Sequence, residues 1–294
     1  MKLLVSVFLL LALGYLATAE VVAFAGKCNK FFLKKQPPTG PAGPQYREIC
    51  QKRDPAGNYE FATLYDTSNK IPVYSAYKFQ SNGGCSRDTP WYIEPQYKNE
   101  LKLFFNPLQL DDPTKGPEMN TQGTVTKPPR GDNQALNDDY DGSGYHRGHL
   151  VPVYHRNAKQ CIDATFTLTN AAPQYPKFNS GAWRVAEATV AKTLDTDCLN
   201  RGFKAYIITG VVPGNTDIKG NNPPNPGSVN VPDYFWSAYC CVDNNKVPVP
   251  SVFGAYHRKN DNSKIATTST TIANLNAMLQ GVYGTGFRVF GNNC

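Results

Sequence analysis

The sequence predicts a mixed α+β fold in one disulfide-bonded domain. Strand-like segments recur along the chain, helical periodicity appears in only two places, and eight cysteines are spread over positions 28 to 294. Pro, Gly and Asn dominate residues 36–44, 111–133 and 214–230, which marks these stretches as surface loops. Cysteines lie on both sides of each loop, so we expect a single domain over residues 20–294.

Residues 1–19 have the pattern of a secretory signal. Lys2 precedes an apolar stretch from Leu3 to Leu16, and Ala17-Thr18-Ala19 forms a small-residue cleavage site before Glu20. The stretch is short for a bilayer span, and no later segment approaches the roughly 20 apolar residues that a membrane helix needs. We therefore expect a secreted, extracellular protein without a membrane span.

The cysteines and the charge agree with export and with a polyanionic partner. An even number of cysteines in an exported chain favours disulfides over metal ligation, although the sequence leaves the pairing open. Adjacent residues of a strand face opposite sides, so we expect Cys240 and Cys241 to bond different partners. The net charge is +7, or +6 after removal of Lys2 with the signal, which suits nucleic acid but does not establish it.

Tyr, Phe, Val, Ile and Thr are enriched in the segments that we expect to be strands. A short polar connection, residues 67–70, predicts a hairpin between the first two of them. The expected strands are Phe61–Asp66, Pro72–Phe79, Ala164–Thr169, Ala205–Thr209, Tyr234–Val242 and Ser251–Tyr256.

Two segments have helical periodicity. Apolar residues recur at spacings of three and four from Asn179 to Leu194, and Asn179 is expected to be the N-cap. A second helix is expected from Thr270 to Gln280, with Gly281 ending it.

Three of the four histidines, His146, His149 and His155, fall within ten residues. One interpretation is a zinc cluster, but the glutamate of the H-E-x-x-H zinc motif is absent and Arg147 occupies its place. The other is a single catalytic imidazole, which we favour. It would sit in the segment Tyr145-His146-Arg147-Gly148-His149-Leu150, upstream of the strand, loop and helix expected between residues 166 and 187.

This segment, together with Asn179, Trp183 and Glu187 at spacings of four, resembles the DNA/RNA non-specific endonuclease family. The family has a ββα-metal, or His-Me finger, site. The chain is more similar still to the secreted branch of endonuclease domain-containing 1 proteins of fishes. Further matches to that branch occur in the same order along the chain, at residues 61–66, 71–77, 209–213 and 231–236.

The resemblance implies a central, mainly antiparallel sheet flanked by helices and long loops, and hydrolysis of DNA and RNA with little sequence preference. It implies that His149 is the general base and that Asn179 holds one divalent ion, Mg²⁺ or alternatively Mn²⁺ or another cation. A neutral imidazole can accept a proton near neutral pH, and an ion held by few protein oxygens keeps its waters and its Lewis acidity. Such contacts touch no base, so low specificity follows.

Four further residues are site candidates. Arg147 carries a planar cation suited to phosphate, or alternatively pairs with Asp138 or Asp139. Glu187 is expected to act on the ion through water, because eight residues of continuous helix separate it from Asn179 by about 12 Å. Gln174 and Asn170 match polar positions of the family, for which we assign only a supporting or substrate-binding role.

His146 stands where the family carries aspartate. The resemblance therefore leaves a second hypothesis, an extracellular nucleic-acid-binding protein on the same scaffold whose turnover is weakened by this change. The preference for DNA or RNA, the oligomeric state and the biological role are not fixed by the sequence.

Overall fold

A computed structural model describes residues 20–52, 58–81, 91–94, 120–121, 131, 133–157, 163–218 and 229–294. Within these residues a central sheet of eight antiparallel strands has the order β1-β2-β3-β4-β9-β12-β13-β14. Its strands are β1 (Glu20–Val21), β2 (Tyr46–Gln51), β3 (Phe61–Asp66), β4 (Ile71–Lys78), β9 (Lys204–Val212), β12 (Tyr234–Val242), β13 (Pro248–Lys259) and β14 (Thr268–Thr270).

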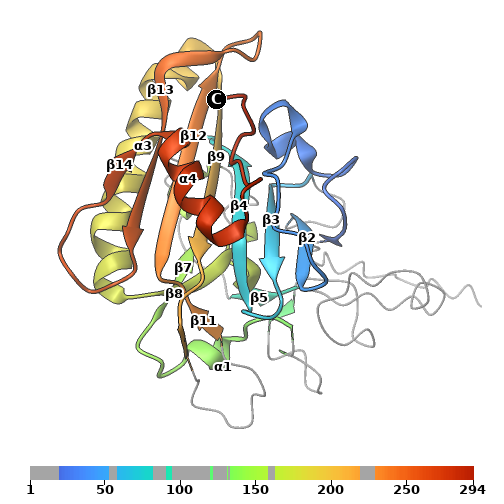
Figure 1. Cartoon of the computed structure of the whole chain (residues 1–294), viewed down its shortest axis with the longest axis vertical. Coiled ribbons are helices and arrows are strands. Elements are labelled where there is room, and N and C mark those ends of the chain that lie inside the picture. The colour runs from blue at the N-terminus through green and yellow to red at the C-terminus, as the bar shows by residue number, and fades with distance from the viewer. Residues whose placement is uncertain are drawn as a thin grey trace, which may run out of the picture.

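The sheet separates two apolar cores, so the fold has three layers. Alternate residues of a strand face opposite sides, and Ile207 and Ile208 accordingly belong to different cores. Helix α3 (Arg184–Asp197) covers one face, and helix α4 (Ile272–Tyr283) covers the other together with the short helices η1 (Asn29–Phe31) and η2 (Leu33–Lys35) (Figure 1). The expected α+β fold with an antiparallel sheet is confirmed.

Disulfides connect each face of the sheet to its covering layer. Cys241 bonds Cys198 at the end of α3, and Cys240 bonds Cys294 on the opposite side. The prediction of different partners for the two adjacent cysteines is thus confirmed. A third disulfide among the described residues joins Cys28 to Cys50. Cys85, Cys161 and the expected signal, residues 1–19, lie outside the described residues.

The predicted hairpin at residues 67–70 is also confirmed. The carboxylate of Asp66 accepts hydrogen bonds from the backbone N–H groups of Ser68 and Asn69, at 2.9 and 3.1 Å. These bonds stabilise a tight turn between β3 and β4, which pair in antiparallel register.

Two expectations about single elements are wrong. Residues 164–169 do not form a strand, because Phe166 N–H bonds back to Asp163 and Asn170 N–H bonds back to Thr167, and these local turns lead into η5 (Leu168–Asn170). Helix α4 does not stop at Gly281, since one glycine inside a helix costs only about 1 kcal/mol. It ends at Tyr283, and the following Gly284 has a φ of 99°, which lies outside the helical region.

A smaller ββα unit, whose helix is α3, carries the candidate site. Strand β7 (His146–His149) pairs antiparallel with β8 (Ala171–Gln174), and the chain then passes through η6 (Phe178–Trp183) into α3. The remaining elements are β5 (Tyr92–Ile93), β6 (Asn120–Thr121), α1 (Asn137–Tyr140), η4 (Val153–His155), η7 (Leu199–Arg201), β10 (Thr216–Ile218) and β11 (Val229–Val231). Of the helices in the described part of the chain, none has the length and hydropathy needed to cross a membrane.

Candidate active site

A cleft of about 520 Å³ opens between β7, η4 and the start of α3. Four of the six residues expected at the site line it, namely His149, Arg147, Asn179 and Glu187. The other two, Asn170 and Gln174, are buried behind it. Residues that sequence reasoning did not assign complete the wall: Trp91, Tyr145, His146, Pro152, Val153, Tyr154, Ser180 and Arg184.

The imidazole of His149 is held by aromatic side chains at the end of β7. Its ring centre lies 4.7 Å from that of Trp91 and 4.9 Å from that of Phe166, the latter in an edge-to-face contact. The backbone of His149 pairs with Ala171 of β8. The ring is therefore positioned by packing on two sides and by the strand, while it still contributes to the cleft wall.

Asn179 does not have the predicted N-cap role. It lies in η6, a π-helical turn in which Gly181 has a non-helical backbone (φ −104°, ψ −117°), and α3 starts only at Arg184. Such turns re-aim side chains and recur at functional sites. The side chain of Asn179 turns to β7, where its amide nitrogen donates to Nδ1 of His146 at 3.3 Å.

The break at Gly181 also removes the assumed continuous helix between Asn179 and Glu187, although both residues line the cleft. Burial raises the pKa of the Glu187 carboxyl to about 8, an effect that the nearby Arg184 guanidinium only partly opposes. A cation in the cleft would favour the ionised carboxylate.

The residues present fit a hard cation held by few protein ligands. The contact with His146 uses the amide nitrogen of Asn179, which leaves the amide oxygen for a cation, and Glu187 supplies a carboxyl in the same cleft. Mg²⁺ binds in this way, through one or two protein oxygens and several waters. Within the described residues, no group of three His, Cys, Asp or Glu side chains is placed to hold a metal.

The three clustered histidines do not converge. His146 and His149 line the cleft, whereas His155 is buried and bonded to Tyr77 and to the backbone of α3. Tyr77 Oη lies 2.8 Å from His155 Nδ1, and His155 Nε2 lies 3.0 Å from the carbonyl oxygen of Glu187. With the hydroxyl donating to Nδ1, Nε2–H donates to the carbonyl. His155 thus attaches η4 to the helix that carries Glu187.

Arg147 is already engaged in an ion pair. Its guanidinium lies 2.8 Å from Asp141, donates to the carbonyl of Asn137 and packs over the ring of Tyr140. The partner is Asp141, not Asp138 or Asp139 as the sequence suggested, because Asp139 instead accepts the backbone N–H of Leu136.

Gln174 and Asn170 support the strand behind His149. A Cβ at Gly148 would lie 2.2 Å from Cδ of Gln174, so this position has room only for glycine. The amide of Asn170 donates to the carbonyls of Val151 and Thr165 and accepts from Val151 N–H, which fixes the backbone just after β7.

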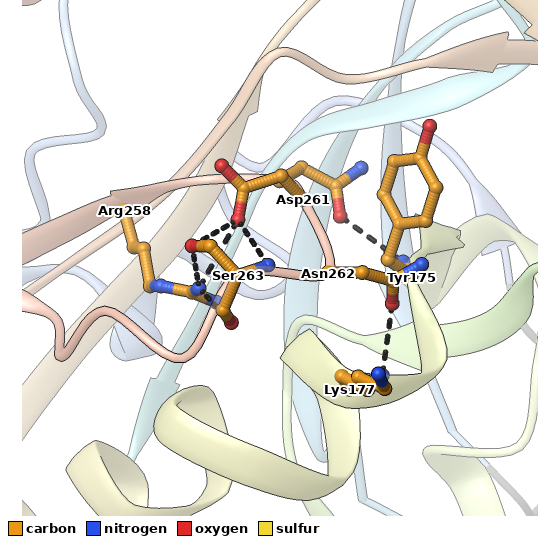
Figure 2. A network of polar contacts seen from close by, with 7 residues as sticks. Tyr175, Lys177, Arg258, Asp261, Asn262 and Ser263 are labelled. Carbon is orange, nitrogen blue, oxygen red and sulfur yellow. Dashed lines mark hydrogen bonds and ion pairs between the residues drawn. The ribbon is translucent and has the colours of Figure 1, made fainter.

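A clamp that sequence reasoning missed holds the segment before Asn179. The buried Asn260 donates to the carbonyls of Pro173 and Pro232 and accepts from the backbone N–H of Tyr175, while Asn262 accepts from Lys177 N–H at 3.3 Å. Figure 2 shows this loop against residues 175–177, with an adjoining network of Arg258, Asp261 and Ser263. The bonds to residues 173–177 join positions that are 85 to 87 apart in sequence, so no local signal identifies them.

The chain is similar to several known proteins. The chain is 35% identical over 232 residues to human endonuclease domain-containing 1 protein and 33% identical over 240 residues to the mouse protein. These matches cover 78% and 79% of the chain but only 41% and 43% of the relatives, so the chain spans less than half their length. The expected similarity to endonuclease domain-containing 1 proteins is confirmed, and the relatives that show it are mammalian. The expected similarity to the fish members of this branch stays a prediction.

Two further comparisons are more limited. Human mitochondrial endonuclease G is 46% identical over 79 residues, about a quarter of each protein. The crystal structure of an EndoG/EndoGI complex contains a chain with a TM-score of 0.52 and 20% identity, matched over 80% of this chain and 84% of that one, which shows a shared fold. The model of the DNA/RNA non-specific endonuclease family matches residues 114–291. The chain therefore belongs to the DNA/RNA non-specific endonuclease family.

Proposed function

We propose that the protein is a secreted, Mg²⁺-dependent endonuclease that hydrolyses DNA and RNA with little sequence preference. One observation carries the proposal: His149 and Asn179, which the sequence pairs as base and metal ligand, line the same cleft although 30 residues separate them. The family membership, with its nucleic-acid substrates, supports the same reaction.

In this proposal the imidazole of His149 accepts a proton from the water that attacks the phosphorus atom. Its packing between Trp91 and Phe166 fixes the direction of the ring before substrate arrives. Asn179 and Glu187 are the residues that would hold Mg²⁺, Asn179 directly and Glu187 through water. When bound, the ion supplies positive charge to the phosphate and to the departing 3′ oxygen.

Arg147 is proposed to contribute positive charge at the phosphate from its fixed position beside Asp141. Gln174 and Asn170 act indirectly, since they are buried and keep β7 and the following backbone in place. None of the proposed roles involves a base, which accounts for low sequence preference.

Export is proposed on the signal pattern of residues 1–19. The three described disulfides support an oxidising compartment. N-terminal sequencing of protein collected from the medium of expressing cells should read from Glu20. Retention of Met1 on the exported protein would contradict it.

The activity is tested with purified mature protein, supercoiled plasmid and a structured RNA. Both should be degraded in Mg²⁺ to fragments with 5′-phosphate ends, and a chelator should stop the reaction. At the Mg²⁺ concentration that saturates the wild type, His149→Ala and Asn179→Ala should both lose most of the cleavage rate, while Lys204→Ala, a change at an exposed position on β9 away from the cleft, should retain the wild-type rate. Full activity in either site variant would contradict the assignment.

The second hypothesis, binding with weakened turnover, is supported by the contact between Asn179 and His146 in place of an aspartate. It predicts salt-sensitive binding of nucleic acid without cleavage. The His146→Asp variant distinguishes the two hypotheses. A large gain in its cleavage rate would favour the second one, in which His146 weakens turnover.

A further inference from the structure

A second cleft of about 500 Å³ adjoins the first along α3. The two clefts share Tyr154 and Arg184, so a path runs from His149 past these two residues and along one face of the helix. Arg184, Ala188, Lys192 and Asp195 are spaced by four, four and three residues, which places them on that face.

Arg184 stands at the junction of the two clefts, and its guanidinium forms no ion pair with a carboxylate of the described residues. It is exposed, its Nε donates to the carbonyl of Ser180 at 3.3 Å, and Glu187 acts on it only as a nearby negative charge. Arg147, in the same wall, is instead paired with Asp141. Of these two arginines, Arg184 is thus the one whose guanidinium fork is open to a phosphate.

Tyr154 presents an aromatic surface at the same junction. Its side chain is 42% exposed, although most large rings of this protein are buried. It lies on η4, whose next residue, His155, is bonded to Tyr77 and to the Glu187 carbonyl. The Tyr154 ring therefore lies on a turn that His155 holds in place, and it lines both clefts together with Arg184. Such a ring can stack on an unpaired base.

The charges along the second cleft limit its length. Lys192 is exposed and lies about 12 Å beyond Arg184 along the helix axis. Asp195, the next residue on that face, also lines this cleft and carries the opposite charge. The basic part of the cleft therefore extends from Arg184 to Lys192.

We propose that the second cleft is a subsite for single-stranded nucleic acid flanking the scissile phosphate, with Arg184 and Lys192 at phosphates and Tyr154 stacked on a base. A single strand is required because the faces of a paired base are covered by its neighbours. The proposal rests on the proposed function, since it takes the first cleft as the place of cleavage.

The test measures binding without cleavage. The His149→Ala protein is titrated into fluorescein-labelled single-stranded and duplex DNA of equal length, in Mg²⁺ and at several salt concentrations, with anisotropy as the readout. Adding Tyr154→Ala should weaken single-strand binding about 5-fold or more and leave duplex binding unchanged, whereas Tyr154→Phe should retain the affinity. Lys192→Ala should lower the salt slope by about 0.7 on the single strand.

Lys204→Ala is the matched control, because it removes the same charge from an exposed site outside both clefts. It should leave affinity and slope unchanged. Single-strand affinities equal to the parent in both Tyr154→Ala and Lys192→Ala would overturn the subsite. Equal losses on single strand and duplex in Tyr154→Ala would overturn its stacking role.

Cleavage of the same single strand is measured in parallel with proteins that retain His149. If the wild type does not cleave while the binding pattern holds, the proposed function fails, and the second cleft stands as a site for single-stranded nucleic acid without a scissile phosphate beside it. If the wild type cleaves and the Tyr154 and Lys192 variants have unchanged Kd and KM, the subsite alone fails.

Discussion

The side-chain amide of Asn179 donates to Nδ1 of His146 at 3.3 Å, so the expected metal ligand is oriented by the residue that replaces the family aspartate. This contact joins η6 to β7 across the cleft opening. It uses the amide nitrogen of Asn179, which leaves the amide oxygen for the proposed cation.

His146→Asp tests whether the histidine already performs this orienting role. A carboxylate would accept the same hydrogen bond, so we expect the plasmid cleavage rate to change by less than about tenfold, the scale of one hydrogen bond. His146→Ala should lower the rate by a similar factor. A several-hundredfold gain in the cleavage rate of His146→Asp would instead support the second hypothesis, in which His146 weakens turnover.

His155 predicts a pH dependence of stability. Burial lowers the pKa of its imidazole to about 4, below the ordinary value of 6.5 that applies in the unfolded chain. The unfolded state therefore binds a proton that the folded state does not, and stability falls as pH drops from about 6.5 to 4, by at most about 1.4 kcal/mol per pH unit. Above pH 6.5 this contribution is constant.

Urea unfolding of wild type and His155→Gln over this pH range isolates the effect, because carboxyl groups contribute alike to both proteins. The free energy of unfolding should fall more steeply with decreasing pH in the wild type than in His155→Gln. Parallel curves would show that His155 does not titrate in this way.

The Asn260 clamp predicts a coupling between stability and metal binding. Asn260→Ala leaves the carbonyls of Pro173 and Pro232 without their donor, at about 1 to 3 kcal/mol for each buried group. Because the same segment leads into η6, the Mg²⁺ concentration for half-maximal cleavage should rise. Asn262→Ala is the control, since this exposed residue makes one bond of 3.3 Å and should cost under about 0.5 kcal/mol. If Asn260→Ala lost stability but kept the wild-type Mg²⁺ dependence, the clamp would contribute to stability and not to metal binding.

Gly148 predicts a steric coupling. Gly148→Ala places Cβ against the buried Gln174, and we expect a loss of about 1 to 3 kcal/mol from overpacking. The smaller side chain of Gln174→Ser should recover part of this loss in the double variant, as a thermodynamic cycle by urea unfolding would measure. Additive losses would show that the two positions do not compete for space.

Local patterns predicted β3, β4, β9, β12 and β13 of the central sheet but not β1, β2 or β14. Strands β3 and β12 begin and end at the expected residues, because aromatic and β-branched side chains fill both buried faces of a central strand. Residues 164–169 have the same composition but do not form a strand. There Thr167 and Thr169 are buried around the Glu94 carboxylate, a contact between distant parts of the chain that overrides propensity.

The motif residues of the site were predictable, but their surroundings were not. His149, Arg147, Asn179 and Glu187 reach one cleft because β7 and α3 are adjacent in the ββα unit. Asn179 faces His146 because the backbone departs from helical geometry at Gly181. The spacing of apolar residues predicts a continuous helix there and gives no sign of this break. The sequence did not single out Arg184, because solvent-exposed arginines are common on helices. Only its place in the cleft wall makes it a candidate site residue.

The most direct test of the paired roles of His149 and Asn179 is the Mg²⁺ dependence of the plasmid cleavage rate in wild type, Asn179→Ala and His149→Ala. Loss of a metal ligand should raise the Mg²⁺ concentration for half-maximal rate in Asn179→Ala, with partial recovery at high Mg²⁺. Loss of the base should lower the rate of His149→Ala at every Mg²⁺ concentration without shifting the midpoint. A shifted midpoint in His149→Ala with an unchanged one in Asn179→Ala would contradict the assignment.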